Sequence, residues 1–478
     1  MARYPGFVGP AYTAQSKIAA ADDLVNLFVE RNESGTGKAP YVALSAPGYT
    51  PFCTLPTSPV RGMTTLNGAT FAVGGGSLYQ LPFTLGGSPR LIGSGLHNPD
   101  DSFATISGNG DAGGDQLYVT SGSKGYAADL RASTVTQVND GPTQGAFMDA
   151  YFIALNPSRS EITLSALEDG TTWDPLDTAQ RSDTPDKFLA LLVNHKELWF
   201  FGSQTTAVYY NNGDSDFPFV TNPSQFITKG ISAPWAAALL DGSPIWPGNG
   251  VDGGCSIYWA QGYTPVRVST HAVEYSLSQL SAAVLSGAEG FSYQERGHSF
   301  YALNVPGAVC WVFDATTKLW HRRTSIDGMS LAVRGHAYAN GVHLVGSRTS
   351  GVIYQMSADL FTDIDGSGLR RLRRAPHLTD EGRRATYDSL RIDAEVGIGL
   401  TSGQGSDPQG MLRWSDDGGQ TWSNVYTASF GPRGAFRTRA IWRRLYGRGD
   451  DRVFEFSYSE PTSLTLIDAY LEMRAGIS

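Results

Sequence analysis

The sequence predicts an all-β protein that combines a β-propeller with an antiparallel β-sandwich or jelly-roll domain. A short apolar and aromatic run, a Gly or Ser turn and a second short run recur at intervals of roughly 35 to 60 residues. The composition agrees, because 56 Gly and 25 Pro with only 17% charged residues are typical of a turn-rich β protein. A small sheet cannot bury both faces alone, so the repeat indicates about six or seven blades, not necessarily regular, stacked around an axis. The runs centre on Phe71, Tyr118, Phe152, Trp199, Tyr258, Phe300 and Leu344.

Three segments are expected along the chain. Residues 1–54 mix one extended apolar stretch with turn residues and are predicted to form an arm that contributes to the second domain. Residues 55–365 carry the repeat and form the propeller. Residues 366–478 begin with a charged stretch, GSGLRRLRRAPHLTDEGRRAT, and then alternate polar and apolar residues as strands do. The two terminal segments together are expected to build a platform beside the propeller.

Two features interrupt the strand pattern. The best helix candidate is SLSQLSAAVLSG, residues 276–287. The longest interruption is NNGDSDFPFVTNPSQFITKG, residues 211–230, which is rich in Asn, Asp, Pro and Phe. Loops on a rigid scaffold carry much of molecular recognition, so this loop is a candidate contact surface.

Charge and cysteine content narrow the function classes. A net charge of -9 provides no general attraction to nucleic acid or to an anionic membrane, so such contacts would need a local patch. The three cysteines are odd in number and lack CxxC spacing, which predicts reduced packing residues. No stretch resembles a signal peptide or an apolar membrane span, and we expect synthesis in a bacterial cytoplasm without membrane insertion.

The sharpest local motif is an Asp box, Ser-x-Asp-x-Gly-x-x-Trp, formed by Ser415, Asp417, Gly419 and Trp422. A carboxylate in such a box accepts backbone N–H groups across a tight turn, Gly permits positive φ, and the Trp is expected to pack beneath. A degenerate copy has Glu168, Gly170 and Trp173 at the same spacing. Asp boxes occur in sialidases, but the box lies at a hairpin tip and does not cleave glycosides, so we favour a structural role.

Other motifs fail as catalytic or cofactor sites. The pair Gly37-Lys38 lacks both the first Gly and the Ser or Thr of a P-loop. Asp363, Asp365 and Gly366 resemble part of a calcium loop, but a bidentate Glu is missing, so a turn is favoured over a weak surface cation site. No metal-ligand spacing involves a histidine. We therefore expect no catalytic residue, no cofactor and no metal.

Arginines are concentrated in the C-terminal part of the chain. One interpretation is a solvated strand face with ion pairs to Asp450 and Asp451. The other is a surface that contacts a neighbouring subunit or a partner, because arginine presents forked donors to carboxylates and phosphates. We favour subunit contact over direct DNA binding, because aromatic residues are not interleaved as in single-strand binders. The candidate contact residues are Arg370, Arg371, Arg437, Arg439, Arg443 and Arg444.

Several long phrases, in order, resemble the phage stabilisation family of short-tailed bacteriophages, also called packaged-DNA stabilisation or tail nozzle proteins. They are LSALEDGTTWDPLD, ELWFFGSQTTAVYYNNGDSDFPF, IYWAQGYTPVRVSTHAVEYSL, KLWHRR and WSDDGGQTWS. The resemblance implies a structural virion protein of the tail, without enzymatic activity, that forms a hexameric ring below the portal and adaptor. Such a ring retains packaged DNA and is the conduit for its ejection. The implied partners are the adaptor, a tail fibre or spike, a central plug or needle, and double-stranded DNA that passes without sequence specificity.

Two alternatives place the function at the host surface. A sialidase-like, glycan-hydrolysing propeller predicts arginines that converge on the propeller axis. The available residues are Arg61, Arg159, Arg267, Arg296, Arg334 and Arg348. A noncatalytic glycan-binding propeller predicts aromatic contacts from residues 211–230.

Overall fold

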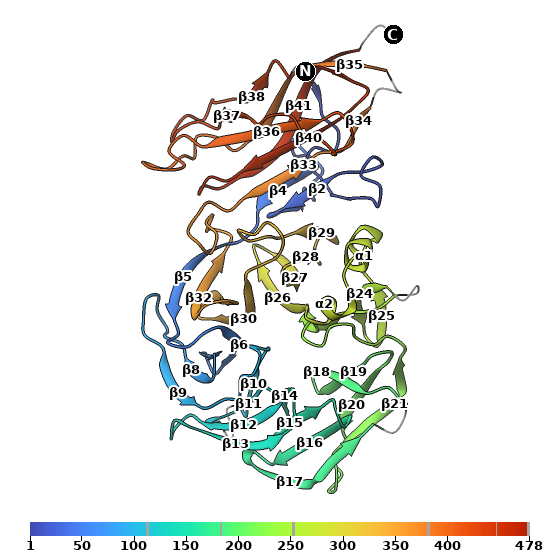
Figure 1. Ribbon diagram of the computed structural model, residues 1–478, viewed down its shortest axis with the longest axis vertical. Coiled ribbons are helices and arrows are strands. Elements are labelled where there is room, and N and C mark those ends of the chain that lie inside the picture. Colours follow the sequence, from blue (N-terminus) through green and yellow to red (C-terminus); the bar gives the residue numbers. More distant parts are fainter. Residues whose placement is uncertain (111–113, 182–183, 251–253, 380–382, 446, 476–478) are drawn as a thin grey trace.

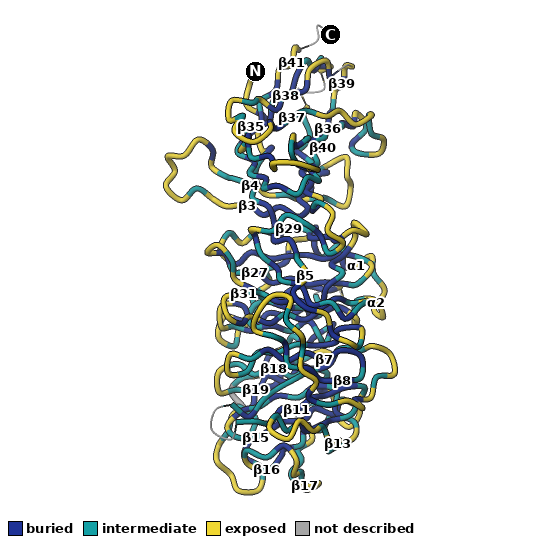
Figure 2. Tube along the Cα trace, turned by 90° about the vertical axis from the view of Figure 1, so that its left-hand side faces the viewer, coloured by how far each residue is buried: buried dark blue, intermediate teal, exposed yellow. Residues whose placement is uncertain are grey.

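The computed structural model describes residues 1–478 except 111–113, 182–183, 251–253, 380–382, 446 and 476–478. A ring of small sheets forms one end of an elongated molecule, and a sandwich that contains both chain termini forms the other end (Figure 1). Buried residues follow the strands, and exposed residues are concentrated in the connecting turns (Figure 2). The predicted all-β class, with a propeller and a sandwich, is confirmed.

The propeller consists of six separate four-stranded antiparallel sheets and a seventh four-stranded unit that belongs to a larger sheet. The first three sheets are β6 (Val60–Leu66), β7 (Ala69–Gly74), β8 (Ser77–Gln80) and β9 (Arg90–Ser94); β10 (Thr105–Gly108), β11 (Gln116–Ser121), β12 (Lys124–Asp129) and β13 (Thr134–Asp140); and β14 (Gln144–Met148), β15 (Tyr151–Asn156), β16 (Glu161–Ala166) and β17 (Asp169–Gln180). The next two are β18 (Phe188–Asn194), β19 (Glu197–Gly202), β20 (Thr206–Asn211) and β21 (Phe219–Ile227); and β22 (Ala238–Leu240), β23 (Ser243–Asn249), β24 (Cys255–Gln261) and β25 (Thr264–Arg267). The seventh unit is β26 (Glu289–Glu295), β27 (His298–Val305), β28 (Val309–Asp314) and β29 (Leu319–Arg322).

The sixth separate sheet closes the ring with a strand from the start of the chain. Strands β30 (Val333–Ala339), β31 (Val342–Ser347) and β32 (Val352–Ser357) are completed by β5 (Gly48–Thr54), which pairs antiparallel with β32. The innermost strand β30 then contacts β6 of the first blade. The predicted arm of residues 1–54 is therefore corrected at its end, because β5 belongs to the propeller. The predicted boundary at residue 366 stays a prediction; it falls between β32 and β33.

Two-residue turns explain how the hairpins of the blades form. Asn67-Gly68 joins β6 to β7, and Asn340-Gly341 joins β30 to β31; all four residues have φ between 49° and 78°. Asn and Gly tolerate this left-handed region, and the resulting turn matches the right-handed twist of the paired strands. The Gly-containing turns that separate the apolar runs in the sequence are these hairpin turns.

The sandwich combines segments from both ends of the chain. One of its sheets has seven strands: β3 (Leu27–Arg31), β4 (Tyr41–Ser45), β41 (Thr465–Ala475), β35 (Ala385–Ala394) and β38 (Ala440–Arg443) in that order, with β1 (Ala2–Arg3) paired to β41 and β39 (Arg448–Gly449) paired to β35. The other sheet has ten strands and continues from β29 through β2 (Asp23–Val25), β33 (Arg371–Arg374), β40 (Asp451–Tyr458), β36 (Gln409–Ser415) and β37 (Tyr426–Ser429), with β34 (Leu378–Thr379) beside β40. The blade β26–β29 and the sandwich thus share one hydrogen-bonded sheet.

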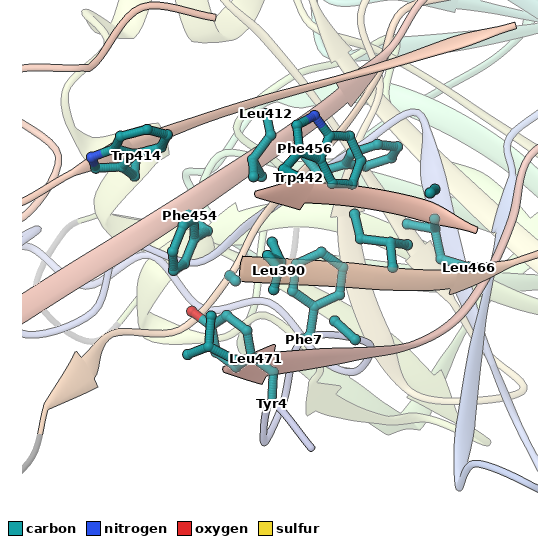
Figure 3. Packing of buried hydrophobic residues seen from close by; sticks show 14 of the residues in the cluster. Tyr4, Phe7, Leu390, Leu412, Trp414, Trp442, Phe454, Phe456, Leu466 and Leu471 are labelled. Carbon is teal, nitrogen blue, oxygen red and sulfur yellow. The ribbon is translucent and has the colours of Figure 1, made fainter. Parts of the chain in front are cut away.

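The sandwich core lies between these two sheets. Leu390 of β35 faces Phe454 and Phe456 of β40, and Tyr4 and Phe7 from the N-terminal segment join the same cluster (Figure 3). All five are at most 2% exposed. The first residues of the chain are therefore part of the sandwich core rather than a loose tail.

Two sequence predictions of local structure are corrected. The helix predicted at 276–287 is two short helices, α1 (His271–Ser278) and α2 (Ala282–Ser286). They are separate because Ser281 caps α2, its hydroxyl accepting the N–H of Val284 at 3.3 Å. The predicted loop at 211–230 contains β21, whose Phe219 is 2% exposed, so much of this segment is the outer strand of a blade.

Candidate functional site

The two sheets of the sandwich end on the same side of the molecule. Strand β38 is the last strand of the seven-stranded sheet, and β37 is the last of the ten-stranded sheet. The indole N–H of Trp442 on β38 donates to the carbonyl oxygen of Tyr426 on β37 at 2.9 Å and ties the two strands together. We call β37, β38 and the turn 430–439 between them the open edge. An end strand presents backbone N–H and C=O groups that another chain can pair with.

Four of the six predicted contact residues lie on this open edge or directly after it. Arg437 and Arg439 precede β38, Arg443 ends it, and Arg444 follows; all four are exposed. None has an ion pair or side-chain hydrogen bond within the described part of the chain. The alternative interpretation, ion pairs to Asp450 and Asp451, is not seen for these four arginines in the described residues, and the Asp451 carboxylate binds Nδ1 of His377 at 2.8 Å. These four cations are available to a partner.

Apolar side chains accompany the arginines on the open edge, and the sequence reading missed them. On the open edge, Phe436 is 73% exposed and Tyr426 is 37% exposed, and Val425, directly before β37, is 54% exposed. The Phe436 backbone N–H donates to the Gly434 carbonyl at 2.9 Å within the tight turn 431–438. Arginine and aromatic residues together are enriched at protein interfaces. The available signal was a lone Phe in the polar phrase GPRGAFRTR, which has no place in a strand pattern.

The other two predicted contact residues, Arg370 and Arg371, differ from each other. Arg370 is exposed, and its carbonyl accepts the side-chain amide of Asn26 at 2.8 Å. Arg371 has no exposed surface and is not available to a partner, which corrects the prediction. Its guanidinium donates to the carbonyls of Leu369 (3.0 Å), Thr462 (2.7 Å) and Glu460 and to the Ser45 hydroxyl (3.2 Å).

Two further arginines of the basic clusters are internal. Arg373 is 1% exposed and donates to the carbonyls of Phe7 at 2.6 Å and Gly6 at 2.7 Å. Arg452 is fully buried and binds the Asp416 carboxylate at 2.5 and 2.7 Å. Each fixes a segment to the sandwich, so the charge-rich sequence overstates the positive charge of the surface.

The Asp box forms the turn between β36 and β37. The Ser415 hydroxyl donates to the Asp417 carboxylate at 2.6 Å and accepts the Gly419 N–H at 2.8 Å. The same carboxylate accepts the N–H groups of Gln420 at 2.9 Å and Thr421 at 2.8 Å. Donors from Ser415 and Thr421 hold the pKa of the Asp417 carboxyl well below its usual range. The carboxylate is occupied by its own turn.

Trp422 packs against the turn at Gly419, where an added Cβ atom would lie 3.6 Å from its ring, but it is not part of the sandwich core. Its half-buried ring lies against two guanidinium groups, with Arg413 at 4.6 Å and Arg374 at 5.1 Å from the ring centroid. Both arginines pair with the buried carboxylate of Glu455. Trp422 therefore covers an ion triad, and the buried Trp of this region is Trp414 on β36.

The degenerate box uses a different acid from the one predicted. Glu168 has φ of 56° and turns the backbone, while the Asp169 carboxylate accepts the Thr171 N–H at 2.9 Å and its hydroxyl at 2.7 Å. The Trp173 indole donates to the Gly170 carbonyl at 2.7 Å. Four such donors lower the pKa of the Asp169 carboxyl to about 2 despite partial burial, which raises it. This copy also caps a turn.

Three of the six propeller arginines considered for a glycan-hydrolysing site lie close together. Arg334 and Arg348 pair with the Glu289 carboxylate at 2.7 and 2.5 Å. Arg61 has no exposed surface and donates to the Ser102 and Gly75 carbonyls at 2.8 and 2.9 Å. Protein acceptors thus occupy most of these guanidinium groups, but Nη2 of Arg61 and Nε of Arg334 are buried without a hydrogen-bond partner among the described residues. The other three lie elsewhere: Arg159 is near Glu161, Arg267 pairs with Glu274, and Arg296 pairs with Asp359.

The described residues contain neither a cluster of metal-ligand side chains nor a membrane-spanning helix. No group of three or more His, Cys, Asp or Glu side chains is arranged there to hold a metal ion. No helix of that part of the chain is long and apolar enough to cross a membrane. Cys53, Cys255 and Cys310 are buried and unpaired, and burial raises the pKa of their thiols to about 11 to 12.

Comparison with known proteins identifies a family for both domains. Residues 15–361 match the model of the bacteriophage P22 Gp10 β-propeller, a phage stabilisation family. Residues 370–474 match that of the bacteriophage P22 Gp10 β-sandwich. No curated protein matches the chain. A chain from the crystal structure of a mitotic checkpoint complex is 12% identical over 64% of this chain and 94% of its own, and its TM-score of 0.41 is too low to bear on function. The chain therefore belongs to the bacteriophage P22 Gp10-like family of phage stabilisation proteins, with a structural role in the virion.

Proposed function

We propose that this protein is the tail nozzle of a short-tailed phage, a ring below the portal and adaptor that retains packaged DNA and conducts it during ejection. The observation that carries the proposal is the ordered match of both domains to the phage stabilisation family. The arrangement of the sandwich is consistent with it, because a closed ring of identical subunits needs a surface that binds a different surface of its neighbour. The open edge offers unpaired backbone groups, exposed arginines and Phe436 for such a contact.

The distribution of charge differs between the two parts of the chain, and this supports different roles for them in the ring. Residues 366–478 hold 16 arginines and no lysine against 14 acidic residues, whereas residues 1–365 hold 20 basic and 31 acidic residues. A lumen lined by the acidic part would not bind the phosphates of passing DNA. The remaining proposed partners are the adaptor, a tail fibre or spike and a central plug. A ring whose lumen is lined by the exposed arginines would contradict this part of the proposal.

The direct test is electron microscopy of the purified chain mixed with the cognate portal and adaptor rings. We expect a six-fold tube that prolongs the channel. Free monomers beside an unchanged adaptor ring would overturn the proposal.

A triple variant tests the open edge as the subunit contact. Arg439→Ser, Arg443→Ser and Arg444→Ser should leave the monomer folded, because these side chains have no intramolecular partner among the described residues, and should reduce assembly into tails. Arg131→Ser with Arg159→Ser is a control for the loss of exposed arginines elsewhere, because these side chains are 83% and 70% exposed on the propeller, where they pair with Asp115 and Glu161. A normal yield of infectious particles from the triple variant would refute the assignment.

A further inference from the structure

The propeller has a pocket where three consecutive blades meet, away from the open edge of the sandwich. Its volume is about 410 Å³. The walls come from the turn between β22 and β23, from β26, and from β30 and β31. Small-ligand sites are concave spaces of roughly 300 to 1,000 Å³, lined by aromatic groups and a few polar ones. The volume is therefore sufficient for a small organic ligand.

Tight turns hold the key side chains in place. Asp241-Gly242 joins β22 to β23 with φ of 48° and 73°, a two-residue hairpin turn in which Asp tolerates the left-handed region. Tyr338 lies two residues before the equivalent turn Asn340-Gly341. Both side chains therefore project from short, hydrogen-bonded hairpins. A site built on such elements is largely formed before a ligand arrives.

Two histidines in the pocket form a hydrogen-bonded chain whose proton positions can be deduced. Nε2 of His343 lies 3.0 Å from the carbonyl oxygen of Gln294, which can only accept, so Nε2 donates. Nδ1 of a neutral His343 must then accept the proton of His336 Nε2, at 2.9 Å. Burial lowers the pKa of His336 to about 3 and also lowers that of His343, so both are neutral at pH 7. Nδ1 of His336 is left as an acceptor without a donor among the described residues.

The remaining polar groups of the pocket are also mainly acceptors. Oδ1 of Asp241 accepts the side-chain amide of Gln294 at 3.1 Å, and its Oδ2 has no partner in the described part of the chain. Tyr338 is 55% exposed, and its ring packs against His343 with 4.7 Å between centroids. The pocket thus combines a fixed aromatic face with acceptors that lack donors. Its ligand should supply several hydroxyl donors and one apolar face.

We propose that this pocket binds a neutral saccharide, with the C–H face of a sugar ring on Tyr338 and hydroxyl groups donating to Asp241 and His336. A sugar ring has one apolar face and a polar edge, which matches an amphipathic aromatic platform flanked by acceptors. An ammonium ion is the competing ligand, because the Asp241 carboxylate and the Tyr338 ring would both attract a cation, and the experiment must distinguish it from a saccharide. This pocket is separate from residues 211–230, the segment in which the sequence suggested aromatic glycan contacts. It goes beyond the proposed structural role and does not depend on it.

Saturation-transfer NMR on the full-length chain tests the site. The probes are the methyl glycosides of glucose, galactose, mannose, rhamnose and N-acetylglucosamine, and tetramethylammonium chloride as a cationic comparison. We expect at least one glycoside to bind with a Kd on the order of 1 mM. Tyr338→Ala should weaken that binding at least tenfold, and Tyr338→Phe should retain most of it because the ring face remains.

Two further variants test whether any observed saccharide binding takes place in this pocket. Asp241→Asn preserves the turn, since Asn also adopts positive φ, and should weaken binding by removing the charged acceptor. Tyr210→Ala is the control, a 40% exposed aromatic on the outer part of a different blade, and should change nothing. Binding of tetramethylammonium alone, binding that survives Tyr338→Ala, or saturation transfer to none of the glycosides would overturn the proposal.

Discussion

Replacing the buried arginine of β33 with alanine should destabilise the sandwich strongly. Arg371 donates four hydrogen bonds to neighbours in three segments of the chain, and its guanidinium lies 4.9 Å from the Tyr458 ring centroid. Burial lowers the pKa of Arg371 to about 10, so it is still charged at pH 7. Arg371→Ala leaves three buried carbonyls without this donor and a cavity in place of the side chain. A buried acceptor left without a donor costs about 1 to 3 kcal/mol, so the three carbonyls and the cavity together should cost about 3 to 5 kcal/mol.

Native-state hydrogen exchange measures this effect strand by strand, so the sandwich can be followed separately from the propeller blades. The opening free energy of β40 amides should fall by about 3 to 5 kcal/mol in Arg371→Ala, with β15 in a distant blade unchanged. Arg443→Ala is the control from the same domain and should stay within about 0.5 kcal/mol, because its side chain is exposed and has no partner among the described residues. Unchanged protection of β40 in Arg371→Ala would refute the reasoning.

Two further predictions concern the Asp-rich turns. Trp422→Ala should lower the free energy of unfolding by about 1 to 2 kcal/mol, because it removes the contacts with Arg374 and Arg413. Replacing the buried Trp414 with alanine should lower it by about 3 to 5 kcal/mol. Equal losses in urea unfolding would contradict the difference in burial. Burial raises the pKa of Asp363 from 3.8 to about 6, so ionisation costs stability as pH rises from about 4 to 6 and the cost is complete above that window. Asp363→Asn should therefore raise the free energy of unfolding by about 1 to 3 kcal/mol at pH 7.5 and by little at pH 4. An equal change in Tm at both pH values would show that the carboxyl group does not titrate as described.

The repeat in the sequence was sufficient to predict the propeller, but it could not predict how the ring closes. Residues 48–54 are recognisable as an extended segment. Their partner β32 lies about 300 residues later, and nothing in the local pattern of either strand specifies the other. Long-range pairing depends on the whole ring being assembled, so the arm was assigned to the wrong domain at its end. Similarly, Ser281 can either continue a helix or cap one, and neighbouring packing decides.

The sequence indicated which type of residue forms the candidate site, but it could not show which of the arginines are exposed. The arginines at 437–444 are exposed as the contact hypothesis requires, but Arg371 has the same local sequence character and is fully buried. Its acceptors come from residues 45, 460 and 462, which no spacing rule connects to position 371. The choice between Glu168 and Asp169 failed for a similar reason, because the motif alignment cannot show which carboxylate the turn orients.

The sharing of strands between the domains has a mechanical consequence. The chain begins in the sandwich, crosses to the propeller at β5, which closes the ring, and returns to the sandwich at β33 after the last blade. Strand β2 joins β29 of a blade to β33 through backbone hydrogen bonds, and the Asn26 amide bonds the carbonyls of Thr324 and Arg370 on both sides of this junction. Opening the ring therefore requires breaking contacts in which both domains take part. In the nozzle proposed above, such coupling would let the propeller bear part of a force that passing DNA applies to the sandwich.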